Sequence, residues 1–172
     1  MGGKYLMHTE SFQLMEKFVL ILKQRLPKGR VLDVGSLDVN GTYKQLFLDY
    51  EYIGLDLCVG NNVDLVSKGP YDFGLESESF DVVISGNTLE HVEMPWLWVL
   101  EIDRVLKSGG YVCCITPYKQ NYHPYPVDCW RILKDGVEAI WVKWFEYNKR
   151  KPYKILINSL EDKDSFFVGQ KI

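Results

Sequence analysis

The sequence predicts an α/β protein in which a mostly parallel sheet carries helices on both faces. Short apolar runs alternate along the chain with segments whose apolar residues recur at helical spacing. These runs are apolar throughout rather than at every second residue, which is typical of strands buried on both faces. The length of 172 residues suits one domain, so we expect a single domain over residues 1–172.

The N-terminal segment, residues 1–28, is predicted to be mainly an amphipathic helix. Its apolar residues recur at helical spacing from Thr9 to Leu26. A core over residues 29–116 follows. It opens with a β-branched run that stops abruptly at Gly35, which predicts a buried parallel strand and a sharp turn.

Strands and helices continue to alternate through this core. The patterns predict a strand at 30–34, a short helix at 42–48, a strand at 52–56, a short strand near 63–66 and a strong strand at 80–85. Pro95 predicts the first turn of the next helix, because proline is favoured there. The basic residue and glycines at 107–110 predict the end of that helix, and a buried strand is expected at 111–116.

The C-terminal part, residues 133–172, is predicted to be an antiparallel edge of the sheet. The segments 141–147 and 164–171 have the composition of strands, and no convincing helix lies between them. Between the core and this edge we expect a loop over residues 117–132.

The charge of the chain argues against a protein that coats nucleic acid. Its net charge is −3 and its pI is near 5.6, whereas such proteins are normally basic. One basic cluster lies near the C-terminus, and such runs are usually a solvated face. Its members are Lys143, Lys149, Arg150, Lys151 and Lys154. Nucleic acid is therefore disfavoured as a partner but stays an alternative.

We expect a soluble, cytoplasmic chain whose oligomeric state is left open. No apolar run approaches the roughly 20 residues that span a bilayer, and no signal-peptide segment follows Met1 to Leu6. The four cysteines lack the spacing of a zinc site and the density of a disulfide scaffold, so they are interpreted as reduced thiols. No metal is expected, because no spacing of Cys, His or carboxylate residues forms a recognisable site.

A ligand of an open parallel sheet binds outside the carboxyl ends of the strands. The first strand runs into the turn from Asp33 to Gly41, where Gly35 lets a ligand approach the backbone. This turn lacks the patterns of a phosphate loop and of a dinucleotide site, which disfavours a nucleoside triphosphate or NAD. The second strand ends at Asp56, whose carboxylate can accept hydrogen bonds from both hydroxyls of an adenosine ribose. The alternative for Asp56 is a solvated loop aspartate.

Five segments in this order resemble the successive motifs of the class I S-adenosylmethionine-dependent methyltransferases. They are Val31-Leu-Asp-Val-Gly35, Tyr52-Ile-Gly-Leu-Asp56, Phe80-Asp-Val-Val-Ile-Ser85, Thr88-Leu-Glu-His-Val92 and Arg104-Val-Leu-Lys-Ser-Gly-Gly110. The resemblance covers about residues 29 to 132 and is closest to the branch that methylates small molecules and sugars, the methyltransferase type 11-like proteins. It implies a doubly wound, Rossmann-like sheet of seven strands with an antiparallel final strand. It also implies S-adenosylmethionine as cofactor and S-adenosylhomocysteine as product.

The resemblance implies cofactor contacts at the strand ends. Asp33 and Gly35 would lie beside the methionine part, Asp56 would contact the ribose, and Asn87 would lie close to the transferred methyl group. We also expect contacts from the neighbouring residues Ser36, Leu57 and Gly86.

Two departures from the family pattern concern the same contacts. The first motif usually continues as G-x-G, whereas here Ser36 and Leu37 follow Gly35 and the next glycine is Gly41. An acid that binds adenine often precedes the fourth strand, and here Tyr71 and Asp72 are the candidates.

Methyl transfer is an in-line displacement, so the protein mainly aligns the acceptor and excludes water. A base with a pKa near neutrality helps when the acceptor must lose a proton, and His91 and His123 are the candidates for it. Glu90 and His91 belong to the loop that should overhang the methyl group. Alternatively, His91 orients this loop by a hydrogen bond to the backbone.

The loop over residues 117–132 is expected to face the methyl acceptor. Its segment Pro126-Val-Asp-Cys-Trp-Arg131 resembles one found on the substrate side of some methyltransferases of this branch. Aromatic faces suit sugars and planar acceptors, and a guanidinium can hold a carboxylate or phosphate. The candidate substrate contacts are Glu90, His91, Tyr118, His123, Asp128, Trp130 and Arg131. Alternatively, Trp130 packs the loop down and Asp128 pairs internally with Arg131.

The leading hypothesis is transfer of a methyl group to an oxygen or nitrogen of a small molecule or glycan precursor. One alternative keeps this chemistry but makes RNA or protein the acceptor, with the basic C-terminal cluster as the contact surface. Another is a catalytically silent methyltransferase fold that serves as a partner subunit. An NAD-dependent oxidoreductase is disfavoured by the missing glycine pattern.

Overall fold

The computed structural model describes residues 9–39 and 41–172. The expectations for Met1 to Leu6 lie outside these residues. The elements are, in chain order, α1 (Thr9–Arg25), β1 (Arg30–Val34), the 3₁₀ turn η1 (Lys44–Leu46), β2 (Glu51–Asp56), β3 (Leu65–Val66), β4 (Phe80–Gly86), the 3₁₀ turn η2 (Leu89–His91), α2 (Pro95–Val105), β5 (Leu106–Pro117), α3 (Lys134–Glu138), the π-helical turn η3 (Ala139–Lys143), α4 (Trp144–Tyr147), β6 (Lys154–Glu161) and β7 (Asp164–Gln170).

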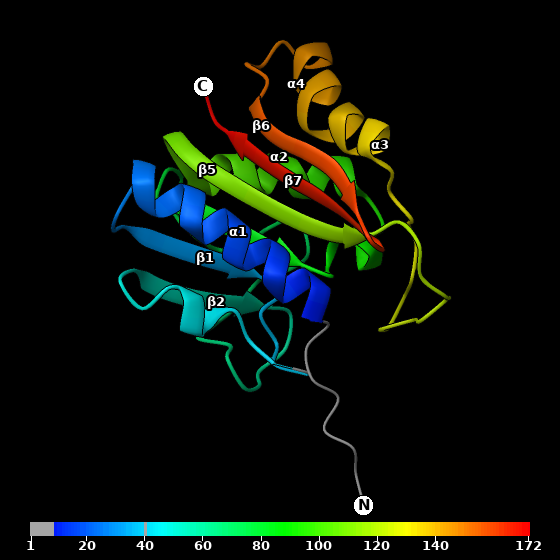
Figure 1. Ribbon diagram of the computed structural model, residues 1–172, viewed down its shortest axis with the longest axis horizontal. Coiled ribbons are helices and arrows are strands. Elements are labelled where there is room, and N and C mark those ends of the chain that lie inside the picture. The colour runs from blue at the N-terminus through cyan, green and yellow to red at the C-terminus, as the bar shows by residue number, and fades with distance from the viewer. Residues whose placement is uncertain (1–8, 40) are drawn as a thin grey trace, which may run out of the picture.

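In this part of the chain the strands form one seven-stranded sheet with the order β3-β2-β1-β4-β5-β7-β6. The strands from β3 to β5 are parallel to their neighbours, whereas β7 is antiparallel to both β5 and β6. The predicted mostly parallel sheet with an antiparallel final strand is therefore confirmed. The carboxyl ends of β1, β2 and β5 point to the same side of the molecule (Figure 1).

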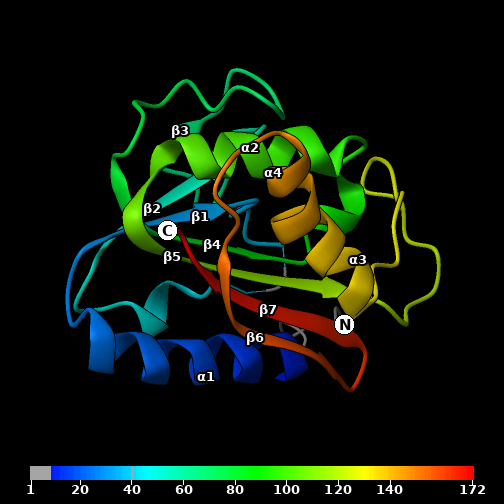
Figure 2. The ribbon, with the colours of Figure 1, turned by 90° about the horizontal axis from the view of Figure 1, so that it is seen from above.

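Helices cover both faces of the sheet, as Figure 2 shows: α1 lies on one side, and α2 with α3 and α4 on the other. Successive strand residues serve opposite faces, because side chains alternate along a strand. Thus Val31 packs in the apolar cluster that contains Phe18 of α1, whereas Leu32 packs in the cluster that contains Trp98 of α2. Each face of the sheet therefore has its own apolar layer.

The helix expected at residues 42–48 is reduced to the 3₁₀ turn η1. Tyr43, Phe47 and Tyr50 are buried against the α1 side, so the segment does turn its apolar residues inward. The Thr42 hydroxyl, however, accepts a hydrogen bond from the Lys44 N–H at 3.0 Å. Such a local side-chain bond competes with the bonds of a regular helix.

The end expected for α2 at residues 107–110 is wrong, since α2 ends at Val105 and β5 begins at the next residue. Both glycines of this segment belong to the strand. The Gly109 N–H donates to the Lys171 carbonyl at 3.0 Å, and the Lys171 N–H donates to the Gly110 carbonyl at 2.9 Å. Pairing beside β7 thus extends β5 back to the helix.

The strand expected at residues 141–147 is also wrong. This segment is helical and buries Trp141, Val142 and Phe145, of which Trp141 and Phe145 pack in the apolar cluster that contains Phe167 of β7. Positions i, i+1 and i+4 share one face of a helix, and burial there outweighs the β-propensity of these residue types. The partner of β7 is instead β6, whose register shifts between Ile155 and Ile157.

Two smaller expectations concern the membrane and the thiols. Within the described residues, no helix has the length and apolar character that crossing a membrane requires.

The four cysteines are free thiols, with Cys113 and Cys114 buried and Cys58 and Cys129 exposed.

Candidate active site

The sheet brings the predicted acidic and glycine residues to one edge. Asp33 of β1 pairs in register with Gly54 of β2 and with Ile84 of β4. Asp56 ends β2 and Gly86 ends β4. Because parallel strands place their carboxyl ends together, these residues meet at a single edge of the sheet.

The turns that follow β1 and β4 pack directly against each other. Gly35 has a φ of +82°, a conformation that residues with a Cβ rarely adopt. A Cβ on Gly35 would lie 2.6 Å from Thr88 Cγ2, and one on Gly86 would lie 2.7 Å from Tyr43 Cζ. Glycine is therefore required at both positions for the two turns to approach.

The long turn after Gly35 is held by residues that sequence reasoning missed. The Ser36 hydroxyl donates to the Asn62 carbonyl at 3.0 Å, and the Asn62 side-chain amide donates to the Ser36 carbonyl at 2.9 Å. The Asp38 N–H donates to the Asn61 carbonyl at 3.0 Å. The Gly-Asn-Asn run that follows β2 was the available signal, since these residues favour turns.

Asp56 connects the same two turns through its carboxylate. One oxygen accepts the Leu37 N–H at 3.0 Å and the other accepts the Leu57 N–H at 2.7 Å. A carboxylate oxygen has lone pairs for more than one hydrogen bond. The half-buried Asp56 is thus fixed in orientation and retains the capacity to accept hydroxyl donors.

Asp33 is a buried carboxyl group at the base of the first turn. It accepts a hydrogen bond from the Tyr52 hydroxyl, which in turn accepts one from the Asn62 amide at 3.1 Å. Burial raises the pKa of Asp33 to about 7, against the opposing effect of the Tyr52 hydrogen bond and with a smaller contribution from Asp56. A cation placed beside Asp33 would favour its ionised form.

Tyr71, Asp72 and Asn87 all have partners within the protein. The Tyr71 hydroxyl accepts the Met94 N–H at 3.1 Å, and the Asp72 carboxylate accepts the Gly74 N–H at 2.9 Å. Asn87 has a φ of +54°, and its N–H donates to the Ile115 carbonyl at 2.9 Å. Asn87 therefore links the loop after β4 to β5.

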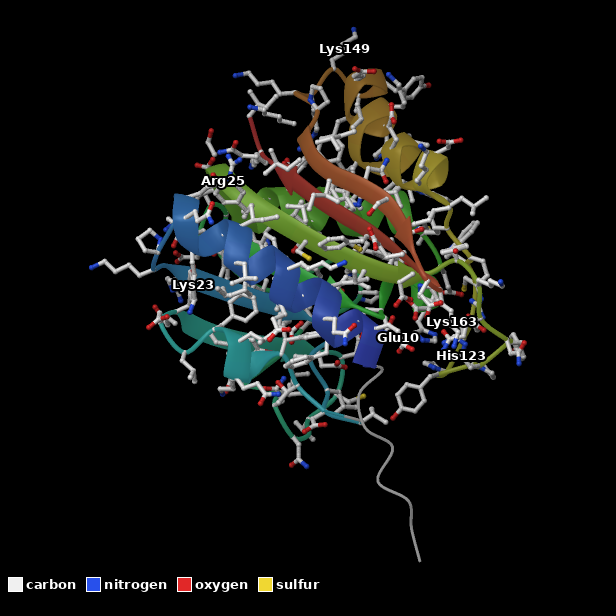
Figure 3. All side chains as sticks on the ribbon, viewed as in Figure 1. Glu10, Lys23, Arg25, His123, Lys149 and Lys163 are labelled. Atoms are coloured by element: carbon white, nitrogen blue, oxygen red, sulfur yellow. The ribbon has the colours of Figure 1, made fainter. Side chains whose placement is uncertain are left out.

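A small cavity lies beside Asn87. Its volume is about 20 Å³, which is room for about one water molecule. The residues that line it are Glu10, Asn87, Gln120, Lys163 and Asp164. Figure 3 shows Glu10, Lys163 and His123 at the same end of the molecule.

Glu90 lies at the centre of the predicted acceptor side and is fully buried. One carboxylate oxygen, Oε2, accepts the Thr116 hydroxyl at 3.1 Å. The other, Oε1, has no hydrogen-bond partner among the described residues. It lies 3.7 Å from His91 Nε2 and 3.9 Å from His123 Nε2.

Both imidazoles are oriented by backbone carbonyls. His91 Nδ1 lies 2.5 Å from the Val127 carbonyl oxygen, and His123 Nδ1 lies 2.8 Å from that of Asn121. A carbonyl only accepts, so each Nδ1 carries a hydrogen, and in the neutral form of a ring the Nε2 lone pair faces Glu90. The Glu90 carboxylate, together with the Asn121 carbonyl and Asp128, raises the pKa of His123.

The expectation that no metal-ligating cluster exists did not foresee this arrangement. Glu90, His91 and His123 bring their ligand atoms within 4.8 Å of one another. His123 comes from the loop after β5, while its two neighbours follow β4. No local spacing encodes such a group, because only the adjacency of β4 and β5 brings the two loops together.

The remaining candidates hold the loop over residues 117–132 in place. The Arg131 guanidinium donates to both Asp128 oxygens, at 2.6 and 2.7 Å, and holds the pKa of Asp128 well below its usual range. The Trp130 ring N–H donates to the Val92 carbonyl at 2.8 Å, and the Tyr118 hydroxyl donates to the Asp162 carbonyl at 2.8 Å. These contacts match the alternatives that the sequence left open for Trp130 and for the pair Asp128–Arg131.

Comparison with known proteins gives one family and many structural relatives. A family model for a methyltransferase domain matches residues 32–114. A chloroplast enzyme of Oryza sativa subsp. japonica, 2-methyl-6-phytyl-1,4-hydroquinone methyltransferase 1, is 26% identical over 88 residues, which are 50% of this chain and 26% of that protein. The chain thus spans about a quarter of the length of this relative.

Two solved structures share the fold. The 1,6-didemethyltoxoflavin-N1-methyltransferase of Burkholderia thailandensis is 13% identical with a TM-score of 0.68, over 95% of this chain and 79% of that chain. A SAM-dependent methyltransferase from Aquifex aeolicus is 16% identical with a TM-score of 0.65, over 95% and 92% of the two chains. At these identities the likeness establishes the fold.

The sheet order, the glycine turn and the family match agree with one another: residues 32–114 match a methyltransferase domain family, and the fold is that of solved S-adenosylmethionine-dependent methyltransferases. The methyltransferase domain match begins in β1 and ends in β5. The residues at this edge fit S-adenosylmethionine in chemistry. Asp33 and Asp56 supply negative charge for a cationic ligand, and Gly35 and Gly86 carry no side chain at the two turns.

Proposed function

We propose that the chain transfers a methyl group from S-adenosylmethionine to an oxygen or nitrogen of a small molecule or glycan precursor, leaving S-adenosylhomocysteine. One observation carries this proposal. The carboxylates of Asp33 and Asp56 and the group Glu90–His91–His123 are positioned by strands of the same sheet edge. A cofactor side and an acceptor side therefore adjoin.

On the cofactor side, Asp56 would receive the ribose hydroxyls on the lone pairs that Leu37 and Leu57 leave unused. Asp33, Gly35 and Ser36 would lie beside the methionine part. Gly86 and Asn87 would border the sulfonium, and Leu57, Tyr71 and Asp72 would border the adenine. Bound S-adenosylmethionine supplies an electrophilic methyl group on a positively charged sulfur.

On the acceptor side, the chain's own residues would orient the acceptor and handle its proton. The His91 and His123 Nε2 atoms carry lone pairs in the neutral rings, and their side chains are 16% and 36% exposed. They are thus placed to meet a hydroxyl or amine proton. Trp130 and Arg131, fixed by Val92 and Asp128, would form the wall of the acceptor site.

The position of the basic cluster favours a small acceptor over RNA or protein. Lys143 pairs with Glu146 at 3.2 Å, and Arg150 pairs with Asp103 at 3.3 Å. Lys149 lies at the end of the molecule opposite His123 (Figure 3). A macromolecule held by this cluster would not engage the proposed acceptor side by the same surface.

The first experiment is calorimetric titration of the purified chain with S-adenosylmethionine and with S-adenosylhomocysteine, with NAD as control. Micromolar binding of the first two alone supports the cofactor site. Release of S-adenosylhomocysteine is then measured with a panel of hydroquinones, nitrogen heterocycles and sugars, the first two chosen from what the named relatives methylate. Absence of binding would overturn the proposal and favour a silent partner subunit.

A further inference from the structure

The acceptor side brings three potential metal-ligand atoms together around a buried carboxylate oxygen. Glu90 Oε1 lies 3.7 Å from His91 Nε2 and 3.9 Å from His123 Nε2, and the three residues offer ligand atoms within 4.8 Å of one another. Each Nδ1 bonds a backbone carbonyl, so in the neutral form of each ring the Nε2 atom that faces Glu90 carries a lone pair. A buried carboxylate oxygen without a donor is costly, so the cluster calls for a cation.

The surroundings of the three atoms match those of metal ligands. Metal-bound histidine nearly always donates its other ring N–H to a carbonyl, carboxylate or water, and bound carboxylates are hydrogen-bonded in turn. Here His91 and His123 have the carbonyls of Val127 and Asn121, and Glu90 has the Thr116 hydroxyl. Each ligand is thus held by its second polar atom.

We propose that Glu90, His91 and His123 bind one divalent transition-metal ion, with Zn²⁺ the preferred ion. Two imidazoles and one carboxylate form the ligand set of open zinc sites, in which the fourth position is left for water or substrate. Ligand atoms of a tetrahedral zinc site are about 3.4 Å apart. The distances of 3.7 and 3.9 Å from Glu90 Oε1 to the two Nε2 atoms require only a small inward movement.

The charges nearby allow a cation at this position. The ligands carry one negative charge, so a bound divalent ion leaves a net charge of +1. The Arg131 guanidinium lies 3.3 Å from His123 Nδ1, but it pairs through two hydrogen bonds with Asp128. Partial exposure of both imidazoles gives the ion a path from solvent.

The open position of the metal would face the acceptor side and take an acceptor oxygen, such as a hydroxyl. This use of the ion rests on the proposed function, whereas metal binding itself does not. With a metal bound, the Nε2 lone pairs are occupied, and His91 and His123 hold the acceptor through the ion instead of taking its proton directly.

The test is titration of the chelator-treated chain with Co²⁺, followed by visible absorption and by calorimetry. We expect one Co²⁺ per chain, with a visible ligand-field band that Zn²⁺ abolishes, because nitrogen and oxygen sites prefer Zn²⁺ to Co²⁺. Absence of stoichiometric binding to the wild-type chain would overturn the proposal.

The variants His123→Ala and Glu90→Gln should weaken metal binding by more than the 10- to 100-fold that loss of a second-shell partner typically costs. His123 lies in a partly exposed loop, so its variant should fold even if removal of the buried Glu90 charge disturbs the core. Both variants should keep affinity for S-adenosylmethionine, which separates failure of the metal site from failure of the proposed function.

Control variants address the other potential ligands. Cys58→Ser with Cys129→Ser removes the two exposed thiols, and His8→Ala removes the third histidine of the sequence. These controls should bind one ion with wild-type affinity. Loss of binding in a control, together with retention in His123→Ala, would place the metal elsewhere and overturn the assignment.

Discussion

Gly35 packs directly against the side chain of Thr88 in the candidate active site. The Gly35 backbone has a positive φ, and the Thr88 side chain, its hydroxyl nearest, fills the space that a Cβ would need. Through this contact the cofactor turn after β1 and the loop that leads to Glu90 and His91 are positioned by one another. A substitution at either residue should therefore alter the position of both the cofactor turn and the loop that leads to Glu90 and His91.

The variant Gly35→Ala should lower the free energy of unfolding by about 3 kcal/mol, from backbone strain and overpacking together. Urea denaturation measures this loss. The double variant Gly35→Ala/Thr88→Ala removes the atoms nearest the new Cβ, so it should regain part of the loss while the φ strain remains. No recovery in the double variant would show that the contact contributes little.

The elevated pKa of Asp33 should appear in the pH dependence of stability. Below pH 3.8, the ordinary aspartate pKa, Asp33 is protonated in the folded and unfolded chain alike. As the pH rises toward about 7 the unfolded chain loses this proton and the folded chain keeps it, so Asp33 lowers the free energy of unfolding across this window. The full effect is about 4 kcal/mol.

The variant Asp33→Asn isolates this contribution, because asparagine keeps an acceptor for the Tyr52 hydroxyl and cannot ionise. The difference in unfolding free energy between variant and wild type should grow in favour of the variant from pH 4 to pH 8, as measured by urea titrations at each pH. A constant difference would refute an elevated pKa.

The same carboxyl group should make cofactor binding pH-dependent. A cationic ligand favours the ionised form of Asp33, so affinity for S-adenosylmethionine should rise as the pH increases through about 7. One pH unit below the pKa, where about a tenth of Asp33 is ionised, the dissociation constant should be about tenfold higher. Calorimetry between pH 5.5 and 7.5 measures this change, and Asp33→Asn should flatten the profile.

The variant Asp56→Asn should weaken cofactor binding by about 1 to 3 kcal/mol, since the amide replaces one of the two acceptor oxygens with a donor and cannot accept from both ribose hydroxyls. Asp49→Asn is the matched control, because Asp49 is an exposed aspartate that pairs with Lys23 and precedes the amino end of β2, whereas Asp56 lies at its carboxyl end. Titration with S-adenosylhomocysteine avoids turnover during the measurement. If the two variants bind S-adenosylhomocysteine with equal affinity, Asp56 is a solvated loop aspartate and does not contact the ribose.

The contribution of His91 to turnover can be separated from its contact with Val127. His91→Asn keeps a donor near the Nδ1 position and removes Nε2, so it should lower kcat by about 10²- to 10⁴-fold with a competent acceptor. Cofactor affinity should change little. His91→Gln places a polar atom near the Nε2 position and should retain more activity; wild-type turnover in His91→Asn would leave only the loop-anchoring role.

The parts of the fold that could be predicted are those in which local pattern and tertiary burial agree. The strand at residues 30–34 is buried on both faces, and Pro95 marks the start of α2. The prediction of a strand at residues 141–147 is wrong because Trp141, Val142 and Phe145 favour strands locally. In the folded chain the three side chains lie on one face of a helix, and their burial there outweighs the local preference. The 3₁₀ turn at Lys44–Leu46 replaces a predicted helix for an equally local reason, the Thr42 hydroxyl.

In the candidate site, too, the residues that could be predicted are those that belong to local sequence motifs. Asp33, Gly35 and Asp56 belong to contiguous motifs at strand ends, so sequence spacing was enough to find them. The meeting of Glu90 with His123 depends on two loops that only the finished sheet brings together. Asn62 was missed because it hydrogen-bonds to Ser36 in the turn after Gly35, and this turn is longer than the family pattern.

The two outer strands of the sheet also bear on how the chain behaves at high concentration. The β3 edge offers two residues, and the β6 edge is interrupted by its register shift and bounded by Lys154 and Glu161. Short, irregular and charged borders are poor templates for hydrogen bonding to another polypeptide. A chain that keeps its long, apolar strands β4 and β5 in the interior of the sheet is thereby protected against strand-mediated aggregation.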